Sequence, residues 1–281
     1  DRSHFRSMDI WQSASLDNNV QTGWIGRWLD STSADPLHAL HLGKTVPRLA
    51  FGEKTTAAVY SYQPKISPRL DDMISALSVS DVNDTPAMTL VCDSYRATSR
   101  VTQQLQALDA DGGPPTAKSR LRDDLDTQLS TVAACIEAGA PTRIYSVELG
   151  GFDTHANERG TQQRLLKRLD SAITRFVDRL SAVEHGENVI IAAYSEFGRR
   201  VAANASDGTD HGTAGPVFVV GKRVQGGFYG EDPSLTDLKD DDLKPTVDFR
   251  DVYQELLSRG LGSDPEPVVG KRRREIGFVS P

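Results

Sequence analysis

The sequence predicts a three-layer α/β/α fold built around a mostly parallel central sheet. Three apolar runs, at residues 143–149, 188–194 and 217–220, have the length and composition of strands. Stretches with helical spacing, at residues 117–138 and 161–183, precede the first two runs. This alternation indicates parallel strands with helical cover, because a parallel neighbour is reached only through a long crossover connection.

The helices of the second half follow from the spacing of their apolar residues. The pattern is clearest in residues 161–183, where apolar side chains form one stripe along the predicted helix. That stripe comprises Leu165, Leu166, Leu169, Ile173, Phe176, Val177 and Leu180. A last helix is expected over residues 248–258, with Gly260 placed to end it.

The first half of the chain is predicted to be mainly helical. Residues 5–29 are expected to be mostly helix, and further helices are expected at residues 67–77 and 95–108. Short extended pieces are expected between residues 45 and 62. The sequence Asp-Gly-Gly-Pro-Pro at residues 111–115 should end a helix firmly.

Two histidines of this half, His38 and His41, lie three residues apart in a stretch that we interpret as helical. Their neighbours are apolar packing residues, and no carboxylate is well placed in so short a helix. We therefore expect a surface or half-buried structural pair and not a ligand pair.

Composition limits the classes of function. The 281 residues are expected to form a single domain, and 38% hydrophobic content is enough for a core. A formal net charge of −7 argues against nucleic acid as a partner, since such proteins need a basic face. Cys92 and Cys135 make no disulfide framework. No apolar run approaches the ~20 residues of a membrane span, so no transmembrane segment is expected.

The most informative segment is ELGGFDTH at residues 148–155, directly after a predicted strand. In an extended chain residues i and i+2 point the same way, so Asp153 and His155 can face one ion. Carboxylate and neutral imidazole suit zinc, manganese or iron. The alternative is a glycine turn in which Asp153 caps the next helix.

A second polar cluster, SEFGRR at residues 195–200, follows the predicted strand 188–194. Glu196 is a candidate metal ligand or general base. One of the two arginines could hold a phosphate or sulfate, which the guanidinium fork suits. The alternative is a helix start with Glu196 in its first turn.

A third cluster contains Asp210 and His211 among glycines, ahead of the strand 217–220. Adjacent residues of an extended chain point opposite ways, so we expect His211 to reach the metal and Asp210 to support it or to bind through a sharp bend. The alternative is a flexible polar turn. Three such clusters beside three strands favour a metal centre at the sheet edge.

Six motifs in order resemble one known family. They are SHF at residues 3–5, GWxGR at 23–27, GFDTH at 151–155, SEFGR at 195–199, TDHG at 209–212 and KPTVDFR at 244–250. The chain is similar throughout to domain-of-unknown-function family 1501, a bacterial family related to alkaline phosphatases and sulfatases. The resemblance implies an alkaline-phosphatase-like hydrolase fold, a divalent metal (zinc first, then manganese, calcium or magnesium) and export to the periplasm or beyond.

The resemblance also implies roles for individual residues. The metal ligands would be Asp153, His155, Glu196, Asp210 and His211. Ser3, followed by His4 at a helix start, is where the attacking nucleophile is expected, and Arg199 would stabilise charge on the transferred group. The expected reaction is hydrolysis of a phosphate or sulfate ester, in a small molecule or a polymer.

Family members carry an apolar strand and a glycine-rich segment ahead of the Ser-His-Phe element, whereas only Asp1 and Arg2 precede Ser3 in this sequence. We therefore expect a sheet that lacks one strand, in which unpaired backbone groups would be costly to bury. A homo-oligomer or a retained peptide would cover the gap. The same observation gives an alternative function, an exported binding or scaffolding module with a vestigial hydrolase site.

Overall fold

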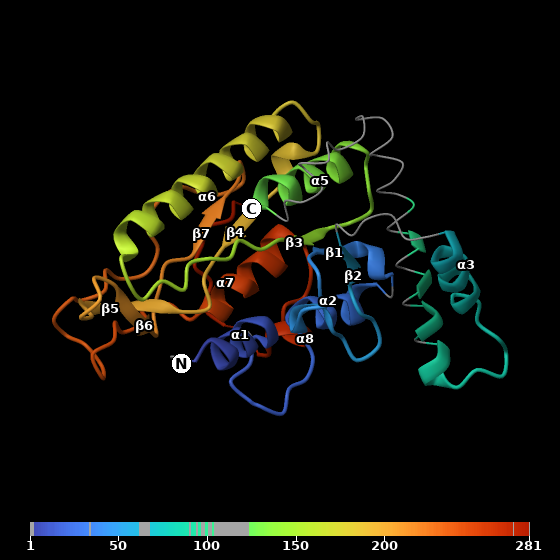
Figure 1. Ribbon diagram of the computed structural model, residues 1–281, viewed down its shortest axis with the longest axis horizontal. Coiled ribbons are helices and arrows are strands. Elements are labelled where there is room, and N and C mark those ends of the chain that lie inside the picture. The colour runs from blue at the N-terminus through green and yellow to red at the C-terminus, as the bar shows by residue number, and fades with distance from the viewer. Residues whose placement is uncertain are drawn as a thin grey trace. The chain divides into compact units, whose positions relative to one another are not determined.

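The computed structural model describes residues 3–33, 35–61, 68–89, 91–93, 95–96, 99–100, 103, 124–271 and 273–280 (Figure 1). The structure is mixed α/β, with a three-stranded parallel sheet and helices. It comprises two compact units. The first contains Asp1–Val20 and Gly150–Pro281, and the second contains Gln21–Leu149.

The second unit holds the parallel sheet, in the order β2-β1-β3. Its elements are α2 (Trp24–Thr32), β1 (Ala39–Leu42), β2 (Ala58–Tyr60), α3 (Pro68–Leu77), α5 (Leu125–Glu137) and β3 (Ile144–Ser146), with 3-10 turns at Pro36–His38 and Arg48–Ala50. The central strand pairs Leu40 with Ala58 on one side and with Tyr145 on the other. Trp28, Leu29 and Leu42 are almost wholly buried and belong to the core of this unit.

The prediction of a helical stretch around His38 and His41 is wrong. His38 ends a 3-10 turn, and His41 lies in the central strand β1, where it is 2% exposed. Its Nδ1 is 3.2 Å from Ser146 Oγ on β3. A strand buried on both faces shows no polar alternation, so its sequence does not separate it from a short helix.

Several predictions for the second unit fall partly outside the described residues. The helix break at 111–115 and most of the helix at 95–108 lie there, as does the beginning of the helix at 117–138. The remainder of the helix at 117–138 is confirmed as α5. Asp124 caps it by accepting a hydrogen bond from the Thr127 backbone N–H at 3.0 Å.

The first unit combines helices with two antiparallel strand pairs, β4-β7 and β5-β6. Its elements are α1 (His4–Ser13), α6 (Glu158–Leu180), a 3-10 turn (Gly186–Asn188), β4 (Ile191–Ala193), β5 (Gly198–Ala203), β6 (Thr209–Gly212), β7 (Phe218–Val220), α7 (Phe249–Glu255), a π-helical turn (Leu256–Gly260) and α8 (Glu266–Val269). The long amphipathic helix is confirmed as α6, the yellow-green ribbon of Figure 1. The buried residues of α6 are Ala172, Phe176 and Leu180, whereas Leu166 and Val177 of the predicted stripe are exposed.

The antiparallel pairing of β4 with β7 differs from the expected parallel order. Ile191 pairs with Val220 and Ala193 with Phe218. The chain between these strands contains a β-hairpin and no helical crossover, so β7 returns in the opposite direction. This pair packs on Val252, Phe278 and Val279 through Ile190 and Val219.

The hairpin β5-β6 lies where the glycines of the sequence favour a polar loop. Asn204 Oδ1 accepts hydrogen bonds from the backbone N–H groups of Ser206 and Gly208, at 2.9 and 3.2 Å. Asp207 adopts a left-handed conformation with φ of 55°. An Asp-Gly turn of this kind is a recognised hairpin signal. The hairpin brings Arg199 opposite His211.

The carboxyl-terminal segment is tied to α7 through a buried carboxylate. Glu255 is 1% exposed and accepts hydrogen bonds from the backbone N–H groups of Ile276, Gly277 and Val279, at 2.6–3.0 Å. The three hydrogen bonds give partners both to the buried carboxylate and to the backbone N–H groups of the terminal segment, which offsets the cost of burying these polar groups.

Asp248 is expected to stabilise the same helix. It caps α7 through the Arg250 backbone N–H and pairs with the Arg250 and Arg273 guanidinium groups at 2.6 and 2.7 Å. We predict that Asp248→Ala lowers the free energy of unfolding at pH 7 by about 1–2 kcal/mol, measured in urea. The exposed Asp232→Ala is the control, and equal midpoints for the two variants would contradict the prediction.

The stabilisation by Asp248 should also depend on pH. Burial opposes ionisation of Asp248, but hydrogen bonds from Arg250 outweigh it, so the pKa is lowered in the folded protein. The contribution is therefore complete above the ordinary carboxyl pKa of about 3.9 and is lost as pH falls through the lower folded value. The difference between wild type and Asp248→Ala should shrink towards acid.

Candidate metal centre

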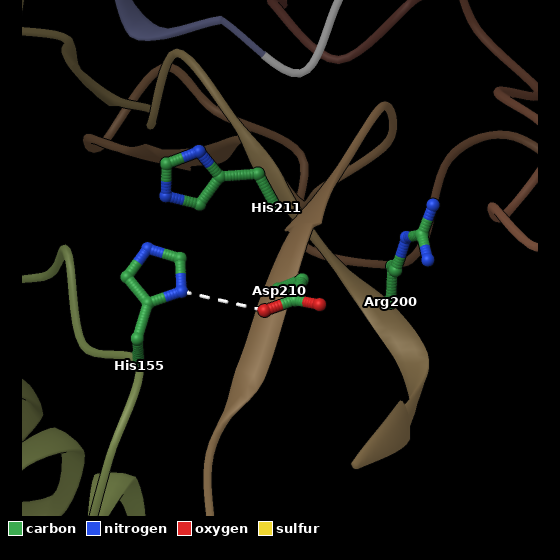
Figure 2. Close-up of a pocket in the computed structure, with 4 residues that line it drawn as sticks. All are labelled: His155, Arg200, Asp210 and His211. Atoms are coloured by element: carbon green, nitrogen blue, oxygen red, sulfur yellow. Dashed lines mark ion pairs between the residues drawn. The ribbon is translucent and has the colours of Figure 1, made fainter. Parts of the chain in front are cut away.

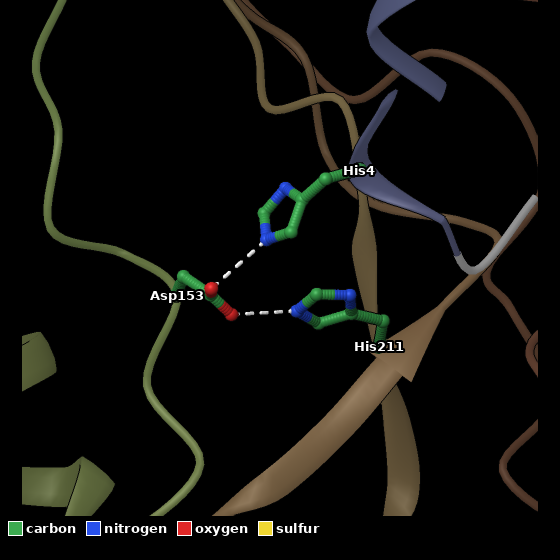
Figure 3. A group of neighbouring side chains, drawn as sticks. All are labelled: His4, Asp153 and His211. Carbon is green, nitrogen blue, oxygen red and sulfur yellow. Dashed lines mark hydrogen bonds and ion pairs between the residues drawn. The ribbon is translucent and has the colours of Figure 1, made fainter. Parts of the chain in front are cut away.

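One carboxylate, that of Asp153, lies among three imidazoles in the first unit. Its Oδ2 is 3.0 Å from His4 Nε2, and its Oδ1 is 2.8 Å from His211 Nε2 (Figure 3). His155 Nε2 is 2.9 Å from the same Oδ1. Three segments far apart in the sequence thus direct ring nitrogens at one acidic group.

Each imidazole is positioned by a different element. His4 is the first residue of α1, which Ser3 caps by accepting from the Arg6 backbone N–H. His211 lies on β6 of the hairpin. The carbonyl of His155 accepts a hydrogen bond at 3.0 Å from Asn204 Nδ2, the residue that also orders the hairpin turn. The hairpin therefore positions two of the three rings.

Two of the imidazoles have a second carboxylate behind them. Glu196 Oε1 is 2.9 Å from His4 Nδ1, and Asp210 Oδ1 is 3.5 Å from His155 Nδ1. A carboxylate at one ring nitrogen fixes the tautomer and orients the other nitrogen. The sequence led us to expect Glu196 as a ligand or general base, and Asp210 as a supporting group or a ligand. The geometry places them one step further out, which suits partners of the ligands.

A phenyl ring holds the imidazoles in place. Phe197, at 9% exposure, stacks on His211 with centroids 4.2 Å apart and meets His4 edge-on at 4.8 Å. The rings of His4 and His211 are themselves 4.4 Å apart. This packing limits how far either ring can turn away from Asp153.

Arg199 fixes the backbone on both sides of Asp153. Its guanidinium donates to the carbonyls of Phe152, Thr154 and Thr209 and to Thr154 Oγ1, with the Thr154 and Thr209 carbonyls each at 2.7 Å. Its Nε is 3.4 Å from Glu158. The side chain expected to stabilise the transferred group is thus committed to holding the Asp153 loop.

The contacts within the cluster favour the charged forms of Asp153 and His4. The pKa of Asp153 is lowered to about 2, first by the hydrogen bond from His211 and then by that from His4, against the effect of burial. Burial acts to lower the pKa of His4, but its hydrogen bonds to Glu196 and Asp153 outweigh this and raise it. An ionised carboxylate is a suitable ligand for a divalent cation. His4 would join it only as a neutral imidazole, so metal binding at His4 would compete with the proton that the raised pKa favours.

The distances also suit a metal. Ligand atoms of His4, Asp153 and His211 all lie within 4.8 Å of one another. Two ligand atoms on a tetrahedral zinc, each about 2.1 Å from the ion, lie roughly 3.4 Å apart. The contacts of 2.8 and 3.0 Å therefore need only small outward shifts to admit an ion.

An open pocket of about 310 Å³ adjoins the cluster (Figure 2). His155, Arg200, Asp210 and His211 line it, so two of the imidazoles border both the pocket and Asp153. Sequence reasoning did not single out Arg200. The sequence signal that could have identified it is the turn at residues 204–208. This turn makes residues 198–212 a hairpin, and the hairpin sets the directions of the Arg199 and Arg200 side chains.

Ser3 lies at the edge of this site as the exposed N-cap of α1. Its place directly before His4 keeps it close to the cluster along the chain. The assignment of Ser3 as nucleophile stays a prediction.

The clamp by Arg199 can be tested by mutation. We predict that Arg199→Met lowers the free energy of unfolding by about 2 kcal/mol, because it leaves the carbonyls of Phe152, Thr154 and Thr209 without their donor. Zinc affinity, measured by calorimetry on the folded variant, should fall as well, since Asp153 loses its fixed position. Arg159→Met, an exposed change on α6, is the control. Unchanged zinc affinity in folded Arg199→Met would contradict the clamp.

The family relationship covers almost the whole chain. The family model described as "Protein of unknown function (DUF1501)" matches residues 3–278, a range that contains every residue of the cluster. No curated protein and no solved structure matches the chain. The chain therefore belongs to the DUF1501 family.

Proposed function

We propose that the protein is a metal-dependent hydrolase of phosphate or sulfate esters with an alkaline-phosphatase-like arrangement of its site. The observation that carries the proposal is the convergence of His4, Asp153 and His211 beside an open pocket. Imidazole–carboxylate sets that border a pocket leave room for a substrate, whereas structural metal sites are closed.

The donor set supports zinc first and manganese second. Calcium and magnesium prefer all-oxygen coordination, which two imidazoles do not offer. His4, Asp153 and His211 would hold the metal. The bound metal would supply Lewis-acid polarisation of the ester oxygen and a lowered pKa for the attacking group.

The protein residues divide the remaining tasks. With a metal bound, Glu196 would accept a hydrogen bond from His4 Nδ1, which would leave His4 Nε2 as the ligand atom. Asp210 lies at His155 Nδ1 and orients that ring in the same way. His155, about half exposed and bordering the pocket, can take up or release a proton at Nε2.

The attacking oxygen belongs either to Ser3 or to water, and a substitution separates the two. Ser3 caps α1 through its side chain, so Ser3→Asp or Ser3→Asn retains a capping group while removing the hydroxyl. Loss of turnover in both variants, with α1 intact by circular dichroism, would support Ser3. Retained turnover would support water.

We propose export and an ester substrate because the sequence motifs resemble those of a family related to alkaline phosphatases and sulfatases. None of the helices in the described part of the chain combines the length and apolar character that a membrane crossing requires. A secreted enzyme of this class would act on a small or polymeric ester outside the cytoplasm.

A non-catalytic binding module is the competing proposal. This proposal is favoured by the contacts of Asp153, which pairs with the imidazoles of His4, His155 and His211. The polar groups of the cluster thus bind one another. Such a protein would bind metal or ligand and turn over no ester.

A substrate screen decides between the two. We predict that aryl phosphates, phosphodiesters or aryl sulfates are hydrolysed when zinc is added, more slowly with manganese, and least with calcium. Asp153→Ala should abolish both turnover and metal binding, because it removes the group that the three imidazoles share. Asp170→Ala, an exposed acid on α6, should change neither.

The contrary results are equally specific. Zinc bound with no turnover of any ester class would favour the binding module. No zinc bound by elemental analysis, in protein purified without chelator, would remove the metal centre altogether.

A further inference from the structure

The two adjacent arginines of β5 have different surroundings. Arg199 donates to three carbonyls and one hydroxyl. Arg200 has one ion pair among the described residues, between its Nε and Asp242 Oδ1 at 3.8 Å, which is too long for a hydrogen bond. Its Nε is buried, and Arg200 also attracts the Asp210 carboxylate electrostatically. The two terminal nitrogens of Arg200 make no hydrogen bond within the described part of the chain, and these are the donors that a ligand could use.

Arg200 is one of the residues that line the pocket. Figure 2 shows it across Asp210 from His155, and its side chain is 27% exposed. The pocket of about 310 Å³ is within the range of small-molecule sites. Of the four residues that line it, only Arg200 carries a positive charge at every working pH.

One negative charge, that of Asp210, shares this pocket. Its carboxylate accepts a hydrogen bond from Asn204 Nδ2 at 3.3 Å and lies 3.5 Å from His155 Nδ1. Asn204 and His155 hold this carboxylate towards the turn, and Arg200 attracts it electrostatically. A divalent cation at Asp153 would add two positive charges to that of Arg200, and together they would balance the carboxylates of Asp153, Asp210 and Asp242.

We propose that Arg200, and not Arg199, binds the anionic group of the substrate, a tetrahedral oxyanion such as phosphate or sulfate, in the pocket bordered by His155 and His211. The proposal rests on the metal centre proposed above. A guanidinium matches two oxygens of a tetrahedral anion at once, which a neutral ester does not offer. Arg200 is then the residue that selects anionic over neutral esters.

A purely structural role predicts something different. In that case Arg200 joins the hairpin to the buried Asp242, and its loss lowers stability while anion affinity stays the same. Stability and anion affinity must therefore both be measured.

The experiment measures binding of inorganic phosphate and inorganic sulfate to the full chain by calorimetry, with and without saturating zinc. Wild type, Arg200→Met, Arg200→Lys and the control Arg159→Met are compared. We expect Arg200→Met to weaken anion binding by about 10-fold or more, Arg200→Lys to retain part of it, and Arg159→Met to match wild type. Zinc affinity should be unchanged in Arg200→Met.

Kinetics on aryl esters with one leaving group add a second readout. Arg200→Met should lower kcat/KM for the aryl phosphate and leave any hydrolysis of the aryl acetate unchanged. Equal anion affinity in wild type and folded Arg200→Met, or no anion binding by wild type in either metal state, overturns the proposal. Arg200-dependent anion binding without ester turnover supports it and instead counts against the hydrolase function.

Discussion

The Asp153 carboxylate is the group on which the rest of the candidate site depends. His4, His155 and His211 approach it at 2.8–3.0 Å from a helix start, a loop and a hairpin strand. These segments meet only through the tertiary fold of the first unit. An ionised carboxylate at this point offsets the cost of bringing imidazoles together, and it gives a cation one shared ligand.

A second level of structure keeps that carboxylate in position. Arg199 holds the backbone before and after Asp153, and Asn204 ties the loop at His155 to the hairpin turn. Glu196 contacts the ring of His4 and Asp210 that of His155, and these contacts orient the two rings. The hairpin β5-β6 contributes to all of these contacts except that of Glu196. The geometry of the site therefore depends on the correct folding of this hairpin.

Sequence reasoning found the residues whose signal is local and missed relations that depend on tertiary structure. Asp153 and His155 are separated by one residue after a strand, which is a local pattern. His4 was expected only beside a nucleophile, because nothing in the sequence marks a partner such as Glu196, 192 residues away. Arg199 and Arg200 could be told apart only once the hairpin set their directions.

The fold shows the same division. The amphipathic spacing that predicts α6 and α7 is a property of each segment, and both helices are present. Strand direction is not such a property, so the antiparallel pairing of β4 with β7 was not foreseen. His41 was placed in a helix because a fully buried strand of four residues has no period that distinguishes it.

The central claim is that one metal ion binds between His4, Asp153 and His211, and X-ray absorption at the zinc edge tests it most directly. The zinc-loaded protein should show nitrogen and oxygen ligands at about 2.0–2.1 Å, with the outer-shell scattering of at least two imidazoles. His4→Ala should lose one imidazole from that spectrum, and Arg159→Met should not change it. A spectrum without imidazole scattering, or one that is identical in His4→Ala, would contradict the account.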